Sequence, residues 1–149
     1  MTEQEKRLLR KELGHLEKMA LLLAQTFSEC EAIGIKDEYS FLELVFLEAL
    51  TSRFARLSDL LIRKIFRLIH TLDYEPQETV RDSINRAEKL GLISDTSLFS
   101  QIRETRNAIA HEYLIEDLSH IYKNVFKHTP ELLETVSRIK SYCTRYDHR

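Results

Sequence analysis

The chain has few residues that break helices or form tight turns. Its 149 residues include only three glycines and two prolines. Sandwiches and barrels of many short strands need a turn every few residues, usually made with glycine or proline. The composition therefore argues against both architectures. A chain of this length can bury a substantial core, so we expect residues 1–149 to form one domain.

Cysteine is also scarce. Cys30 and Cys143 are too few for a disulfide framework, and we expect both to be reduced thiols. The sequence contains no CxxC pair and no HExxH run, which are common signs of a metal site. We therefore expect neither a metal nor another cofactor.

Long apolar runs are missing as well. No stretch of about 18 apolar residues is present, so no membrane-spanning helix is expected. The first twelve residues, MTEQEKRLLRKE, are too highly charged to resemble a signal peptide. These two features favour a cytoplasmic protein without a membrane partner.

The net charge of −2 gives no general reason to bind nucleic acid, but the charge is unevenly distributed. Residues 31–50 contain five acids and one lysine, a net charge of −4. Residues 51–70 contain five arginines or lysines and one aspartate, a net charge of +4. The nearly neutral total therefore conceals a local basic region.

Apolar residues recur at steps of three and four in five segments, which predicts an all-α, up-and-down bundle of about five helices. The first helix is expected from a capping box of Thr2 and Glu5 to about Cys30, with Gly34 closing it. The second is expected from Asp37 or Ser40 to about Leu72. Its apolar seam is widened by Phe46, Ile62, Phe66 and Ile69. A helix that is apolar over so much of its circumference requires a central position or contact with a second subunit. That seam comprises Leu50, Phe54, Leu57, Leu61, Ile65, Leu68 and Leu72.

Three further helices complete the predicted bundle. The third should hold Pro76 in its first turn and end before Gly91. The fourth should begin at a cap formed by Ser94 or Asp95 and reach about His111. The last is expected from Asp117 to Tyr146 as one helix kinked at Pro130. Its apolar residues stay on one face of the helix through the proline if Thr129 occupies the one position of that face that holds no apolar residue.

The run with the clearest chemical content lies at the end of the fourth predicted helix, where residues 103–113 read RETRNAIAHEY. Asn107 and His111 are four residues apart and share a helix face. Arg106 lies about 140° around the helix from His111 at about 100° per residue. Either the arginine must curl toward His111, or the helix must loosen there.

This run resembles the signature of the HEPN superfamily, which is an arginine, a polar residue, three variable positions and a histidine. Tyr113, two residues after the histidine, is similar to a feature of the HepT branch, the toxin half of HEPN/MNT toxin–antitoxin pairs. The resemblance covers most of the chain. It includes the order of five helices, the motif at the end of the fourth, and the sequence TPELLE in the last.

The resemblance implies a homodimeric endoribonuclease that cleaves RNA without a metal at a site composed from both subunits. Arg106 would bind phosphate, His111 would transfer protons and Asn107 would orient the site. Tyr113 would receive AMP from an MNT-type nucleotidyltransferase antitoxin, which silences the toxin. Cleavage by attack of a 2′-OH on its own phosphate needs a base for the hydroxyl, an acid for the leaving 5′-oxygen and a cation for the phosphorane. The motif holds a single histidine, and a dimer would supply two copies of it.

Basic residues recur at helical spacing along the second predicted helix. Arg53, Arg56, Arg63 and Arg67, together with His70, could form a row that binds RNA phosphates. The alternative is an ordinary solvated face balanced by acids.

Other interpretations stay open at this point. Arg106 and His111 also suit an ordinary helix end, and Tyr113 suits the rim of a core. Asp59 and Glu104 could orient an arginine of the site or form surface ion pairs. The whole chain could be a non-catalytic substrate-binding subunit of a nucleotidyltransferase, or a helical interaction domain.

Overall fold

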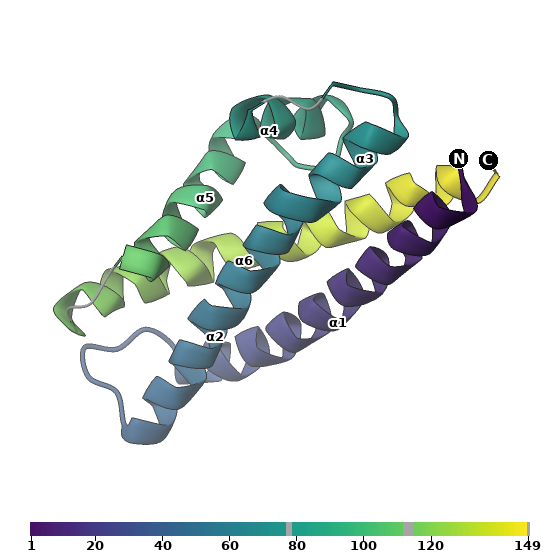
Figure 1. Ribbon diagram of the computed structural model, residues 1–149. Helices are drawn as coiled ribbons and strands as arrows, with labels where there is room; N and C mark the ends of the chain where they lie inside the picture. Colours follow the sequence, from purple (N-terminus) through teal and green to yellow (C-terminus); the bar gives the residue numbers. More distant parts are fainter. Residues whose placement is uncertain (77–78, 112–114, 149) are drawn as a thin grey trace.

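The computed structural model describes residues 1–76, 79–111 and 115–148, which form a single all-α domain with no strand in those ranges (Figure 1). Its helices are α1 (Glu3–Ile33), α2 (Phe41–Leu60), α3 (Phe66–Leu72), α4 (Val80–Lys89), α5 (Thr96–His111) and α6 (Ile115–Cys143). A π-helical turn, Leu61–Ile65, joins α2 to α3, and a 3-10 turn, Thr144–His148, follows α6. Since α2 and α3 form one continuous rod, the predicted bundle of five helices is confirmed.

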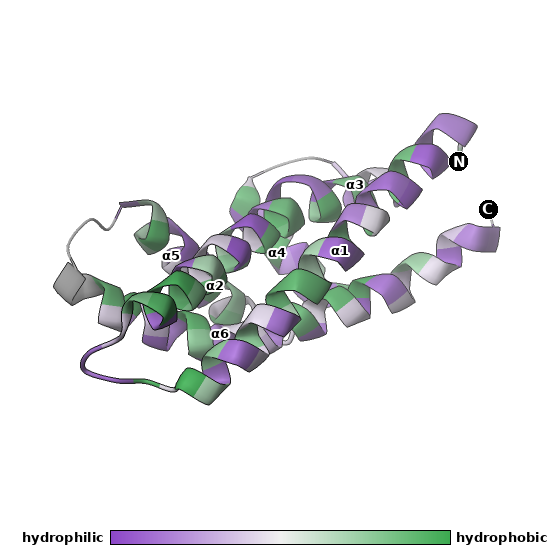
Figure 2. Ribbon diagram, turned by 90° about the horizontal axis from the view of Figure 1, so that it is seen from below, coloured by the Kyte–Doolittle hydropathy of each residue, from purple (hydrophilic) through white to green (hydrophobic). Residues whose placement is uncertain are grey.

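The α2–α3 rod lies at the centre of the bundle. α2 packs against α1, α5 and α6, while α4 closes the far end against α3 and α5. α1 and α6 run in opposite directions, so the two ends of the chain lie at the same end of the molecule (Figure 1). Along α1 hydrophobic and hydrophilic residues alternate, as expected for a helix with one buried face (Figure 2).

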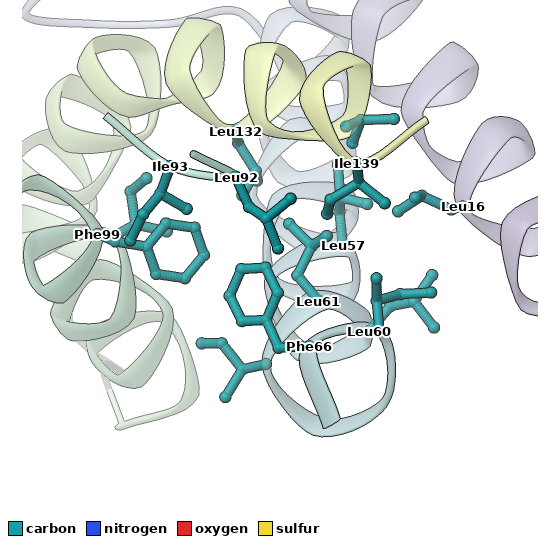
Figure 3. Close-up of a cluster of buried hydrophobic side chains, with 14 of the residues drawn as sticks. Leu16, Leu57, Leu60, Leu61, Phe66, Leu92, Ile93, Phe99, Leu132 and Ile139 are labelled. Carbon is teal, nitrogen blue, oxygen red and sulfur yellow. The ribbon is translucent and has the colours of Figure 1, made fainter. Parts of the chain in front are cut away.

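The core forms where the rod meets the other helices. Leu57, Leu61 and Phe66 point toward Leu132 and Ile139 of α6 (Figure 3). All of these side chains are fully buried, and burial of such a side chain stabilises a fold by about 1.5–3 kcal/mol. In the described parts of the chain, no helix combines the length and the apolar character that crossing a bilayer requires.

The predicted helix ends are largely confirmed. Thr2 and Glu5 form the reciprocal capping box that opens α1, and Gly34 ends this helix with a φ of 75°. Asp95, rather than Ser94, caps α5: its Oδ1 accepts a hydrogen bond of 2.6 Å from the Leu98 amide.

One predicted helix start is wrong. α4 begins at Val80, behind a capping box formed by Thr79 and Asp82, so Pro76 precedes the helix and does not lie in its first turn. The Thr79 side chain accepts a hydrogen bond from a backbone amide that has no partner within the helix. A proline at the first helical position lacks such an amide and therefore makes no hydrogen bond there.

The π-turn was not expected from the sequence. A π-turn holds more residues than an α-turn, so the buried face changes register beyond it. Phe66 and Ile69, predicted to widen the seam, are fully buried, whereas Leu68 of the seam itself is only partly buried. The shift lets the end of the rod pack against α4 and α5, where the rings of Phe66 and Phe99 lie 5.4 Å apart.

α6 continues through Pro130 as predicted. Thr129 is fully buried in the place left open in the apolar stripe, and its hydroxyl donates a hydrogen bond of 2.6 Å to the carbonyl of Val125. Satisfying the hydroxyl within its own helix removes the cost of burying it. A kink at Pro130 stays a prediction.

The buried His128 makes the fold sensitive to acid. Its side chain is 2% exposed, and burial, together with nearby Lys127, lowers the pKa of the imidazole below its ordinary value. His70 is shifted in the same direction by burial. The folded chain therefore binds protons less readily than the unfolded chain, and stability is lost as the pH falls below about 6.5.

We expect His128→Leu to reduce the loss of unfolding free energy between about pH 7.5 and about pH 5.5, as measured by urea denaturation. His15→Gln, at an exposed histidine of α1, is the control. A pH dependence of stability that His128→Leu leaves unchanged would contradict the assignment.

Candidate functional site

Arg106 lies on the side of α5 that faces α2. Its Nε and Nη2 donate hydrogen bonds of 2.6 Å and 2.8 Å to the two carboxylate oxygens of Asp59. Both side chains are partly buried. The planar guanidinium and the planar carboxylate are thus locked in one orientation by two parallel bonds.

This ion pair lies in a shallow cleft of about 310 Å³ between α2 and α5. Small side chains on both helices allow the backbones to approach there, and Arg56 adds a second guanidinium to the lining. The residues lining the cleft are Thr51, Ser52, Ala55, Arg56, Asp59, Arg106, Ile109 and Ala110.

The charge in the cleft favours an anion. The bonds to Asp59 raise the pKa of Arg106 above its ordinary value, so its charge is fixed. A guanidinium has five N–H donors, and Asp59 uses two of them. Three donors remain on Arg106, and Arg56 brings the cleft to two cations against one carboxylate.

Asn107 and His111 lie elsewhere on α5. Both side chains are exposed, and neither lines the cleft at Arg106. α5 is a regular α-helix through His111, so the separation of about 140° between Arg106 and His111 is kept. The expectation that Arg106 curls toward His111, or that the helix loosens, is wrong: the arginine turns to Asp59 instead. Tyr113 lies outside the described residues.

A single chain therefore does not gather the predicted catalytic residues into one cleft. Arg106 and its cleft occupy the α2 side of α5, and His111 is presented to solvent at the last residue of the helix.

The basic residues of the rod do not form one continuous row. Arg56 lines the Arg106 cleft, and Arg63 is exposed just beyond it. Arg67, beyond the π-turn, lines a different cavity beside α4. The register change at the π-turn separates residues that an unbroken α-helix would align.

Two members of the predicted row are engaged in packing. The guanidinium of Arg53 donates hydrogen bonds to the hydroxyl of Thr26 and the carbonyl of Leu22, linking α2 to α1. His70 is buried, with its Nε2 3.2 Å from the carbonyl oxygen of Ser83. The bonds of Arg53 to α1 use only its Nη1, and its contact with RNA stays a prediction, whereas the expectation that His70 joins an exposed row is wrong.

Of the two acids considered as partners of an arginine, the structure selects Asp59. Glu104 is exposed and lines a separate groove between α5 and α6. The sequence signal for Asp59 was its position as the single acid among the five bases of residues 51–70. Among the residues that the structure describes, no three metal-ligating side chains come together.

In comparisons of the chain with protein-family models, curated proteins and solved structures, no match was found. The likeness to the HEPN superfamily therefore rests on residues 103–113, the sequence TPELLE and the helix order.

The ion pair predicts a measurable energetic coupling. In a double-mutant cycle of Asp59→Asn and Arg106→Gln, we expect a coupling of about 1 kcal/mol in unfolding free energy, because the pair is bidentate but partly screened by solvent. The control cycle pairs Asp59→Asn with Arg103→Gln, an exposed residue of the same helix. Equal coupling in the two cycles would show that no specific bond forms.

Proposed function

We propose that this protein is a HepT-like HEPN endoribonuclease that cleaves RNA without a metal and acts as a homodimer. In this proposal an MNT-type nucleotidyltransferase antitoxin neutralises the enzyme by transferring AMP to Tyr113. The observation that supports it best is the state of Arg106, which Asp59 holds in place while three of its N–H donors stay available in a cationic cleft.

Arg106 is suited to bind the scissile phosphate. Asp59 occupies the edge of the guanidinium formed by Nε and Nη2, which leaves the opposite pair of terminal N–H groups for two phosphate oxygens. Because the ion pair already fixes the orientation, the arginine need not reorganise when charge develops on the phosphorane. Arg56 is placed to neutralise an adjoining phosphate.

In this proposal His111 transfers protons, a role that histidine fills more often than any other side chain. The reaction needs a base that removes the 2′-OH proton and an acid that protonates the departing 5′-oxygen. A two-fold dimer that brings the ends of both α5 helices together would place two copies of His111 around one RNA strand. The exposure of His111 at the end of α5 is consistent with this role.

We expect His111→Ala and Arg106→Ala each to lower RNA cleavage by a factor of about 10²–10⁴, because each removes one proton-transfer or charge-stabilising group. The measurement is cleavage of a labelled single-stranded RNA in the presence of EDTA. His15→Ala, at an exposed histidine of α1, is the matched control.

Cleavage by His111→Ala at the rate of the unaltered chain would overturn the nuclease assignment. If the unaltered chain cleaves RNA without EDTA but not with it, the metal-independent mechanism is overturned. If the unaltered chain does not cleave RNA, a non-catalytic binding role replaces the proposal.

Tyr113→Phe should prevent neutralisation while leaving cleavage intact. AMP on the oxygen of Tyr113, two residues after His111 in the sequence, would add a negative phosphodiester and a bulky base, which would repel and block the RNA. Intact-mass measurement after incubation with the partner nucleotidyltransferase and ATP checks this. An AMP adduct on Tyr113→Phe would show that the modified residue is a different one.

A further inference from the structure

The solvent face of α2 is apolar at its start. Phe41 and Leu42 are 83% and 62% exposed, and Val45, about one turn further on, is 45% exposed. All three belong to the first turns of one helix. A single exposed apolar residue is ordinary, whereas neighbouring ones on one helix indicate a surface that another protein covers.

The same face changes in character along the helix. Phe41, Val45, Glu48, Ser52 and Arg56 follow one another at steps of three or four residues, so they share one face of α2. Glu48 and Arg56 are exposed, and within the described chain neither takes part in an ion pair. The face therefore leads from apolar residues, past an acid and a small serine, to a base.

The net charge along the rod has the same asymmetry. Residues 31–50 carry a net charge of −4, and residues 51–70 carry a net charge of +4. A two-fold axis perpendicular to the rod reverses its direction, so the acidic half of one copy meets the basic half of the other. A parallel arrangement would instead set acid against acid and base against base. The partner that fits this pattern is a second copy of the chain in the antiparallel direction.

We propose that the exposed face of α2 pairs antiparallel with the same face of a second copy, about a two-fold axis beside Ser52. Glu48 of each chain then lies opposite Arg56 of the partner subunit, four residues on either side of the axis, so two ion pairs form. Phe41 lies opposite the partner's Arg63, eleven residues on either side, where its ring packs against the guanidinium. A carboxylate takes at most two of the five N–H donors of Arg56, so this arginine keeps donors for a phosphate.

The same axis brings the two Arg106 clefts together. Ile109 and Ala110, near the end of α5, line the cleft together with Ser52, so this end of α5 lies level with the axis. Because the axis is perpendicular to both α2 helices, it keeps the two α5 helices on the same side of them. The ends of both α5 helices, each carrying His111, then face one another across the axis.

The inference rests on the homodimer of the proposed function and names the surface that forms it. Its evidence is the apolar start of α2 and the charge pattern of the rod, neither of which depends on RNA cleavage. Measurements of association therefore test it separately from the nuclease assay.

The first test is the position of the axis. Ser52→Cys should form a covalent dimer in oxidised glutathione, seen on a non-reducing gel, because each copy brings its thiol to the axis. Cys30 and Cys143 are buried, so the unaltered chain should not crosslink. Ser137→Cys, at an exposed serine of α6, is the matched control and should not crosslink either.

The second test is charge reversal, with the Kd of the dimer measured by analytical ultracentrifugation. Glu48→Arg should raise this Kd by about 10-fold or more, because the symmetry turns two attractive pairs into two repulsive ones. Arg56→Glu should do the same, and the chain that carries both changes should regain most of the affinity. Glu134→Arg, at an exposed acid of α6, is the control and should leave the Kd unchanged.

A dimer whose Kd is unchanged in Glu48→Arg would overturn the inference and leave the homodimer standing. Crosslinking of Ser52→Cys no stronger than that of Ser137→Cys would also overturn it, since the axis would lie elsewhere. A chain that stays monomeric at every concentration would overturn both the interface and the homodimer. Dimerisation that responds to the charge changes in a chain without nuclease activity would support the interface and contradict the nuclease assignment alone.

Discussion

Burial of the α2–α3 rod is the constraint on which the rest of the structure depends. Residues such as Leu50, Phe54 and Leu61 are fully buried along its length, and no single neighbouring helix can cover so wide an apolar surface. α1, α5 and α6 pack around the first part, and α4 closes the end. Each remaining helix therefore needs only one apolar face, and its polar face is free for other roles.

The π-turn divides the polar residues of this rod between two surfaces. Before it, Arg56 and Asp59 face α5 and form the cationic cleft with Arg106. After it, Arg67 and His70 face the cavity beside α4. Extra residues in a helical turn often mark functional positions. Here the change of register directs the polar residues of one rod toward two different neighbours while the apolar face stays buried.

Much of the fold could be predicted because its signals are local. The capping box of Thr2, the stop at Gly34 and the burial of Thr129 all follow from patterns within one or two helical turns. Pro76 was misplaced because a proline near a helix start can lie inside or before it. The pairing of Arg106 with Asp59 spans 47 residues of sequence, and helical periodicity contains no information on such a distant contact.

The amino-acid sequence by itself determined that the chain is helical, where most helices begin and end, and that Asn107 and His111 share a face of α5. These follow from backbone geometry and the spacing of apolar residues. Only the tertiary structure decided that Arg106 turns toward Asp59 and away from His111, and that His70 is buried beside α4. Such outcomes depend on which helices become neighbours, and packing across the rod, with its π-turn, sets that arrangement.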